Sequence, residues 1–193
     1  MYEYIKGNIA EISATNMVVE AAGIGYFIHI SLNSYSILNG KKDVKVFLHQ
    51  MVREDAHTLY GFATTSEREL FRSLISVNGV GASTAIMMLS SLNPDELKAA
   101  VTTENVNVLK AVKGIGAKTA QRIIIDLKDK LGKMPESGQI LSVADNTIKN
   151  ESLSALVMLG FVKKDADKIV SKILQEQPEA TVESVIKQAL KRL

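Results

Sequence analysis

A nine-residue stretch that occurs twice constrains this chain more than any other feature. Residues 77–85 read Val-Asn-Gly-Val-Gly-Ala-Ser-Thr-Ala, and residues 112–120 read Val-Lys-Gly-Ile-Gly-Ala-Lys-Thr-Ala. The copies start 35 residues apart (112 − 77) and are identical at six of their nine positions. A repeat at a fixed distance indicates one supersecondary unit that the chain uses twice.

Each copy predicts two helices joined by a tight glycine turn. Apolar residues precede the turn within 70–75 and 106–112, and helical runs follow it at 85–89 and 120–127. Glycine permits positive φ angles and lets another backbone come close. The first N–H groups of the second helix have no partner inside that helix and lie at its positive end. Each unit therefore predicts an anion site.

Positive charge surrounds the second copy. Residues 105–130 contain six Lys or Arg and two acidic residues. Four of these basic residues flank the turn: Lys110, Lys113, Lys118 and Arg122. Such a ring of charge around backbone N–H groups suits a phosphodiester that is bound without reading of its bases. A single Gly-x-Gly turn is more often a structural corner between helices, but two copies in register favour backbone binding of nucleic acid.

Residues 1–63 predict a small β-barrel. Five β-rich segments are separated by glycine and polar turns: 4–12, 16–20, 25–30, 44–49 and 58–62. We favour an OB-like barrel. The number of strands alone does not separate it from an SH3-like barrel or an open sheet.

Two adjacent carboxylates, Glu54 and Asp55, lie between the last two predicted strands, where a hairpin tip points into solvent. The residues alone leave three interpretations open. Spacing favours a plain polar turn; the others are metal ligands for phosphodiester cleavage and negative charge that keeps DNA strands apart. No third carboxylate is placed to complete a metal site, and neighbouring residues on a strand point to opposite faces.

The rest of the chain predicts helices. Residues 64–132 contain the two helical hairpins, 133–149 carry Pro, Gly and Ser and predict a flexible linker, and 150–193 predict a three-helix bundle. The expected fold class is therefore α+β with several domains. Within the bundle, an apolar turn at 158–161 reads Met-Leu-Gly-Phe and is either core or a protein-docking patch.

The composition excludes several kinds of site. The chain has no cysteine, so it holds no disulfide, no thiolate zinc site and no cysteine nucleophile. It has no apolar run of membrane-spanning length and no leader pattern, so we expect a cytoplasmic protein. The sequence contains no Gly-x-x-x-x-Gly-Lys-Ser/Thr loop, so we expect no ATPase activity of its own. We also expect no metal and no cofactor.

The paired glycine turns resemble the helix-hairpin-helix motif of DNA-binding proteins that do not read sequence. The order of barrel, paired hairpins, linker and bundle extends the resemblance over the whole chain, to the RuvA family of Holliday-junction-binding subunits. The most specific stretches are Arg-Glu-Asp-Ala at 53–56, Leu-Tyr-Gly-Phe at 59–62, Asn-Gly-Val-Gly at 78–81, Lys-Gly-Ile-Gly at 113–116 and Lys-Thr-Ala at 118–120.

This resemblance implies a non-catalytic homotetramer, or an octamer on DNA, that holds a four-way junction open. It implies branch migration driven by a partner ATPase, RuvB, in recombination, DNA repair and the SOS response to DNA damage, with the resolving nuclease RuvC as a further partner. Two other functions stay open from the residues themselves. One is a metal-dependent repair nuclease that uses the same hairpins, and the other is a protein adaptor whose glycine turns are only structural.

The resemblance also implies roles for residues. Glu54 and Asp55 would form an acidic pin at the junction centre, and Met158, Leu159 and Phe161 would dock RuvB. Phosphate contacts would come from both hairpins: Asn78, Gly79, Val80, Gly81, Ser83, Lys113, Gly114, Gly116, Lys118, Thr119 and Arg122.

The two hairpins are not equally basic. Ser83 stands in the first copy where the second has Lys118. We therefore expect the first hairpin to depend more on its backbone N–H groups.

Overall fold

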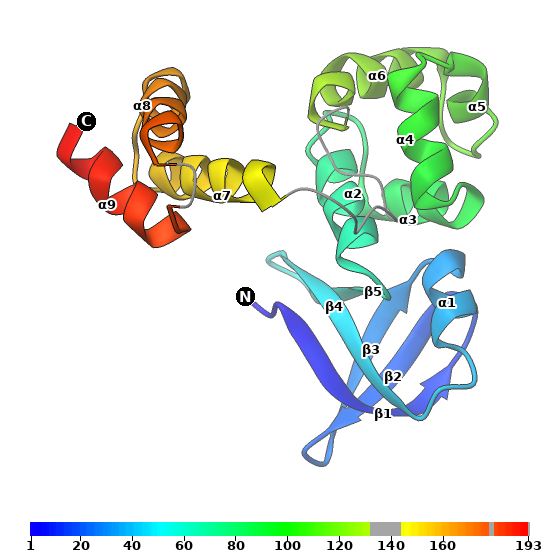
Figure 1. Ribbon diagram of the computed structural model, residues 1–193. Helices are drawn as coiled ribbons and strands as arrows, with labels where there is room; N and C mark the ends of the chain where they lie inside the picture. Colours follow the sequence, from blue (N-terminus) through cyan, green and yellow to red (C-terminus); the bar gives the residue numbers. More distant parts are fainter. Residues whose placement is uncertain (132–143, 178–179, 193) are drawn as a thin grey trace. The chain divides into compact units, whose positions relative to one another are not determined.

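The computed structural model describes residues 1–131, 144–177 and 180–192 (Figure 1). The chain folds into two compact units, Met1–Gly138 and Gln139–Leu193. The first contains a β-barrel and the paired helical hairpins, and the second contains a helical bundle. Within the described residues, no helix is long and apolar enough to span a bilayer.

Five strands close into a barrel in the order β1-β2-β3-β5-β4. Neighbouring strands are antiparallel except β3 and β5, which pair in parallel through His29 with Tyr60 and Ile30 with Gly61. This is the expected OB-like barrel, and its closure excludes the open sheet. The strands are β1 (Tyr4–Ile12), β2 (Asn16–Ala21), β3 (Ile24–Ile30), β4 (Asp43–Val52) and β5 (His57–Phe62).

A short helix between β3 and β4, α1 (Leu32–Leu38), is missing from the sequence-based expectations. Its Leu-Asn-Ser-Tyr-Ser-Ile-Leu sequence contains few strong helix formers, and an isolated helix of this length is unstable in water. Contacts from outside the helix hold it. Ser31 caps its first turn, and Asn33 Nδ2 donates a hydrogen bond to the carbonyl of Leu92 at 3.1 Å.

The tandem of helical hairpins is confirmed. Helices α2 (Thr65–Ile75) and α3 (Ala82–Ser91) flank the first glycine turn, and α5 (Val106–Lys110) and α6 (Ala117–Leu131) flank the second. Between them, α4 (Pro94–Thr102) begins with a capping box in which Asn93 and Glu96 each bond the other's backbone N–H. The apolar stripe of α6 is buried, as the sequence predicts, at Ile123, Ile124, Leu127 and Leu131.

A buried carboxylate, Glu67 of α2, joins the barrel to the helices. Glu67 is 1 % exposed and accepts hydrogen bonds from the hydroxyls of Ser31 and Ser34, the latter at 2.6 Å. Ser34 Oγ in turn accepts from the N–H of Ala63, just after β5, at 2.8 Å. Burial raises the pKa of Glu67, although the two serine hydrogen bonds act to lower it.

Aromatic packing reinforces the same joint. Phe62 of β5 is fully buried and belongs to the core of the helices, where its ring centroid lies 5.0 Å from that of Phe71 in α2. The Tyr60 ring also contacts Phe71, at 5.1 Å. Arg68 of α2 reaches back to the start of the barrel and bonds the carboxylate of Glu3 at 2.5 Å. The barrel and the hairpins are therefore fixed relative to each other.

The second unit is the expected bundle of three helices. These are α7 (Ala144–Met158), α8 (Lys163–Glu176) and α9 (Val182–Arg192). Its small core is built from Leu156, Ala166, Val170, Ile173, Ala180, Val185 and Ala189. Helix α7 begins before residue 150, so residues 144–149 are helical and do not belong to a linker. The remainder of the predicted linker, 133–143, lies outside the described residues.

We expect Glu67→Gln to alter how stability depends on pH. The raised pKa means that the folded state favours the protonated carboxyl. The stability that this group contributes is fully present below its unfolded pKa of about 4.3 and is lost as pH rises through the folded pKa. Glutamine stays neutral, so the stability of the variant relative to the parent should rise with pH between the unfolded and the folded pKa of Glu67.

Urea unfolding followed by tyrosine fluorescence measures this effect, because all five tyrosines lie in the first unit. Glu20→Gln, at an exposed position of β2, is the matched control and should show no such trend. Parallel stability curves for Glu67→Gln and the parent would contradict the expectation.

Candidate nucleic-acid interface

The two glycine turns have the same backbone geometry. Gly79 has φ of 91° and Gly114 has φ of 89°, both in the left-handed region that favours glycine. The next residue points inward in each copy, since Val80 and Ile115 are both 5 % exposed. The first glycine of each pair is therefore required by the turn itself.

The prediction that Val80 contacts DNA is corrected by its burial. The Val80 side chain packs in the core of the helices, and its N–H donates to the Val77 carbonyl at 3.0 Å. The Val80 side chain therefore supports the turn from within. The other predicted residues of the two hairpins are exposed, apart from Thr119, which is half-buried.

The second glycine of each pair has a different explanation. Gly81 and Gly116 have no positive φ, and a Cβ added to either would meet no atom within 4 Å. Neither the backbone conformation nor the internal packing of the chain therefore requires glycine there. Both positions leave open space directly before a helix, where a ligand backbone can come close.

Helices α3 and α6 present similar N-termini at these positions. Ala85 donates to the carbonyl of Gly81 and Ala120 to that of Gly116, both at 2.9 Å, so each glycine accepts the first hydrogen bond of its helix. The N–H groups between Gly81 and Ala85, and between Gly116 and Ala120, have no partner within their helix. Neither helix has an acidic side chain in its first turn, so both ends remain favourable for an anion.

The structure brings the two hairpins together. Arg122 of α6 donates from Nη1 to the backbone carbonyl of Asn78 in the first turn, at 3.2 Å, across 44 residues of sequence. Lys113 and Lys118 are exposed, and within the part of the chain that the structure describes they form no salt bridge. Uncompensated positive charge therefore lies beside paired helix N-termini.

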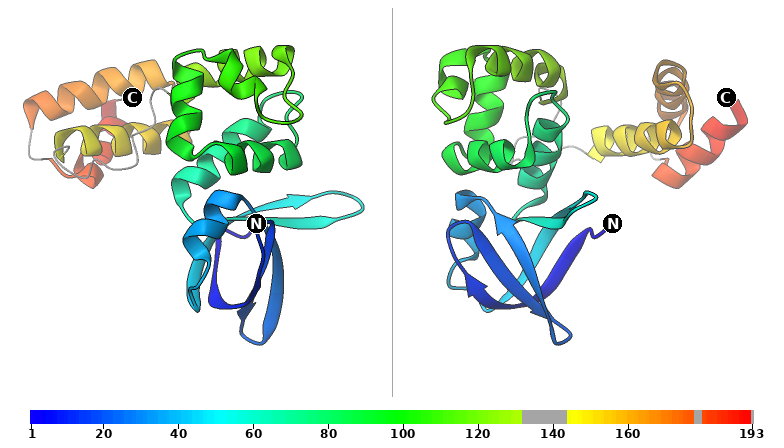
Figure 2. Two further views of the ribbon diagram at one scale, coloured as in Figure 1. Left: turned by 90° about the vertical axis from the view of Figure 1, so that its right-hand side faces the viewer. Right: turned by 180° about the vertical axis from the view of Figure 1, so that it is seen from behind.

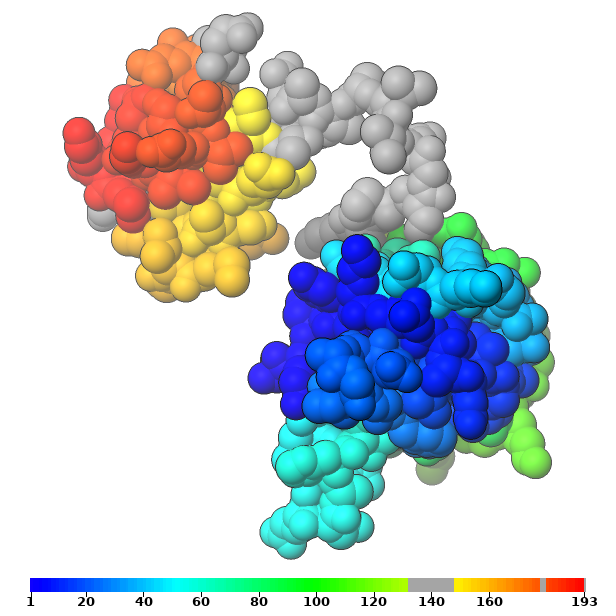
Figure 3. All heavy atoms as spheres, turned by 90° about the horizontal axis from the view of Figure 1, so that it is seen from below, coloured from blue at the N-terminus to red at the C-terminus, as the bar shows by residue number. Residues whose placement is uncertain are grey.

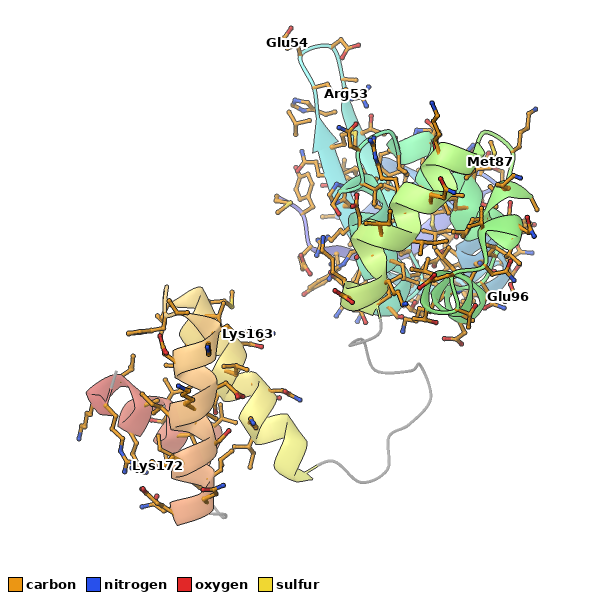
Figure 4. All side chains as sticks on the ribbon, turned by 90° about the horizontal axis from the view of Figure 1, so that it is seen from above. Arg53, Glu54, Met87, Glu96, Lys163 and Lys172 are labelled. Carbon is orange, nitrogen blue, oxygen red and sulfur yellow. The ribbon has the colours of Figure 1, made fainter. Side chains whose placement is uncertain are left out.

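The acidic residues lie at the end of a long hairpin. Strands β4 and β5 extend beyond the barrel, as Figures 2 and 3 show, and the Arg53 N–H closes the turn by donating to the carbonyl of Ala56 at 2.8 Å. Glu54 and Asp55 are exposed, as predicted for a tip. Figure 4 shows Glu54 at the tip and Arg53 next to it, both projecting beyond the helices.

The acidic hairpin and the first glycine turn are neighbours. Asp55 and Thr58 of the hairpin line one cavity together with Gly81 and Ser83. In the residues that the structure covers, no group of three or more His, Cys, Asp or Glu side chains is placed to hold a metal ion. The metal-dependent nuclease therefore has no support from these residues.

The apolar turn of the second unit divides into core and surface. Gly160, with φ of 96°, ends α7 in a Schellman motif in which Phe161 N–H donates to the carbonyl of Leu156. Phe161 is half-buried and packs against the bundle core, whereas Met158 is 88 % exposed and Leu159 60 % exposed.

Sequence reasoning missed two features of these surfaces. Val162 is 65 % exposed and continues the apolar surface of Met158 and Leu159 beyond the turn. The link from Arg122 to the first turn also has no sequence signal, because its acceptor is a backbone carbonyl.

Comparisons with known proteins cover nearly the whole chain. Residues 1–61 match the family model described as the RuvA N terminal domain, 71–129 match the SAM-like helix-hairpin-helix tandem, and 147–193 match the RuvA C-terminal domain.

Curated relatives carry the name Holliday junction branch migration complex subunit RuvA. Those from Christiangramia forsetii, Bacteroides thetaiotaomicron and Flavobacterium psychrophilum are 53 %, 49 % and 48 % identical to this chain. Each alignment covers 100 % of both proteins.

We expect Gly116→Thr to weaken DNA binding without destabilising the fold. Threonine suits the position before a helix about as well as glycine does, and its Cβ would meet no atom of the chain within 4 Å. It does fill the space through which a phosphate would approach. Losing hydrogen bonds to a charged group lowers affinity by roughly tenfold or more, which a titration of labelled DNA measures.

Gly114→Ala provides the contrast, because its positive φ makes it costly for the fold by about 1–2 kcal/mol. Thermal unfolding separates the two effects. The interpretation of Gly116 fails if Gly116→Thr binds DNA as tightly as the parent.

Proposed function

The chain belongs to the RuvA family, and on that basis we propose that it binds four-way DNA junctions and holds them open for branch migration. It acts as a non-catalytic subunit, and the work of moving the junction comes from a partner ATPase of the RuvB type. The observation that carries this proposal is the contact between Arg122 and Asn78, which places two phosphate-binding turns side by side next to an acidic tip.

Both hairpins grip the phosphate backbone. In the second, the exposed amines of Lys113 and Lys118 and the N–H groups before Ala120 face one phosphate group. In the first hairpin, backbone N–H groups and the Ser83 hydroxyl bind a phosphate group with less positive charge nearby. The set of contacts comprises Asn78, Gly79, Gly81, Ser83, Lys113, Gly114, Gly116, Lys118, Thr119 and Arg122, with the buried Val80 supporting the first turn from within. Such contacts position DNA without reading its sequence.

Glu54 and Asp55 act by repulsion. They extend from the barrel on a hairpin whose base lies beside the first grip. Phosphates held by the hairpins bring DNA strands toward this tip, and two carboxylates there disfavour a strand passing across it. The tip therefore favours DNA whose strands have already parted, which is the centre of an open junction.

Assembly of several copies makes these modest grips effective. We propose a homotetramer, with an octamer on DNA as the larger form, because a four-way junction offers four equivalent arms. If each of four subunits neutralises about two phosphates, log K falls against log salt with a slope of roughly −7. A single subunit gives a slope of roughly −2. Simultaneous binding also raises the effective concentration of every grip.

The second unit connects the junction to its motor. Met158 and Leu159 form an exposed apolar surface on a bundle that has a core of its own. We place the ATPase there, with Phe161 supporting the turn from within. A resolving nuclease of the RuvC type acts on the same bound junction, and the whole assembly works in the cytoplasm during recombination and repair.

We expect the double variant Glu54→Gln, Asp55→Asn to lose preference for junctions. Removing two negative charges relieves repulsion of phosphates, so affinity for linear duplex should stay equal or rise about twofold. Affinity for a four-way junction should rise less, so the ratio of junction affinity to duplex affinity falls. Gel-shift titration on both DNAs at two salt concentrations measures this ratio.

Glu20→Gln with Asp43→Asn is the charge-matched control, since both acids are exposed on the barrel away from the tip. It should keep the parental ratio. A uniform loss of affinity for both DNAs in the tip variant would refute the repulsive role.

We expect Met158→Ser with Leu159→Ser to uncouple the motor from the junction. Junction affinity should be unchanged, whereas stimulation of the ATPase and branch migration should fall at least about tenfold, because exposed apolar anchors dominate such contacts. Leu190→Ser, at an exposed apolar position of α9, is the control. Normal branch migration by the double variant would move the docking surface elsewhere.

A further inference from the structure

A cavity of about 200 Å³ lies between the acidic hairpin and the first glycine turn. Its walls on the hairpin side are formed by Met51, Arg53, Asp55, Thr58 and Tyr60, and Ser83 closes the other side. If the proposed function holds, one DNA strand runs from the first grip past this cavity to the acidic tip. The first nucleotide beyond the crossover therefore comes to lie over the opening.

The lining offers both kinds of hydrogen-bonding group. Arg53 supplies a cationic donor, Asp55 an acceptor, and Thr58, Tyr60 and Ser83 supply hydroxyls that do both. In the described parts of the chain, Arg53 and Asp55 form no salt bridge with each other or with any other side chain. Both charged groups therefore remain available to a ligand.

The wall on the Tyr60 side is rigid. The Tyr60 ring is held between Phe71, at 5.1 Å between ring centroids, and His29, at 5.6 Å. Tyr60 also pairs in register with His49 in the β4–β5 ladder. Apolar atoms of Met51, on the adjoining strand, complete a surface on which a flat ring can lie.

Charge and size identify the occupant. A bare phosphate is disfavoured, because the Asp55 carboxylate faces the same space. The volume is below the ~300 Å³ at which pockets for drug-sized ligands begin, so one ring system fits and a base pair does not. Pockets for bases combine apolar stacking surfaces with hydrogen bonds to the base edge, and this cavity has both.

We infer that the cavity receives one unpaired nucleobase from the strand that crosses the acidic tip. Repulsion by the tip parts the strands, and the base that loses its partner then gains stacking and edge hydrogen bonds in the cavity. Because the lining has donors and acceptors, it accepts different bases, as branch migration through any sequence requires. The cavity thereby lowers the free energy of the open junction next to the point where it opens.

Permanganate oxidation of thymine tests this inference with the full-length protein. The substrate is a fixed four-way junction with a thymine–thymine mismatch beside the crossover, so that the reporter base is unpaired whether or not protein is bound. Permanganate attacks exposed, unstacked thymine, and a base held in the cavity is shielded. In the parent complex we expect reactivity at least about fivefold below that of the free junction, in line with the stacking energy of a single base.

Two variants fill the cavity from different walls. Ala56→Leu adds bulk at an exposed hairpin position that lines the cavity, and Thr58→Leu adds it from β5. Both should restore reactivity to the level of the free junction, measured at protein concentrations that saturate the junction in every sample. Val52→Leu is the control, because this exposed residue of β4, in the same hairpin, does not line the cavity.

The permanganate results test the base site, and the preference for junction over duplex tests the proposed function. Protection in the parent and in Val52→Leu, lost in both filled variants, supports the cavity as a base site. Equal reactivity of parent and filled variants, whether high or low, overturns it. Failure of the parent to prefer the junction over duplex would instead contradict the proposed function.

Discussion

The candidate interface depends on the rigid joint between the barrel and α2. Glu67 accepts hydrogen bonds from two serines that are bonded in turn to α1 and to the end of β5, and Phe62 and Phe71 pack beside it. Strand β5 forms half of the acidic hairpin, while α2 leads into the first glycine turn. These contacts join the elements that carry the proposed repulsion at the tip and the proposed attraction at the turn. The hydrogen bonds to Glu67 offset only part of the cost of burying a carboxylate, so its pKa stays raised.

The glycines of each turn serve two different purposes. Gly79 and Gly114 adopt positive φ, so the turn itself explains them. Gly81 and Gly116 have ordinary backbone angles and open space around them, so nothing within the described chain explains them. We propose that they leave room for a ligand that approaches the backbone from outside. The distinction separates residues that build the motif from residues that leave room for its ligand.

Opposite charges on one rigid unit give the proposed selectivity for DNA shape. Lysines and helix N-termini attract any phosphodiester, whereas Glu54 and Asp55 penalise a strand that crosses the tip. Ordinary duplex is attracted by the lysines and helix N-termini but is repelled where it crosses the two carboxylates. An open junction satisfies both, and the proposed role of the cavity beside the tip is to hold a base that has lost its partner.

Much of this was predictable from the chain itself. The 35-residue repeat determined the two hairpins, the alternation within 1–63 determined the five strands, and adjacent carboxylates between the last strands determined a solvated tip, because each is a local pattern. The existence of α1 was not predictable, since α1 is held by contacts to distant residues such as Leu92.

Tertiary structure alone decided which parts of the site meet. Val80 and Phe161 look like accessible turn residues in the sequence, but they pack in cores that only the assembled helices create. The contact of Arg122 with Asn78 and the cavity shared by the hairpin and Ser83 join segments many residues apart. Sequence patterns fix which chemical groups each element carries, because periodicity and turn chemistry are local. The distances between those groups follow only from packing, and packing joins residues that are far apart in the sequence.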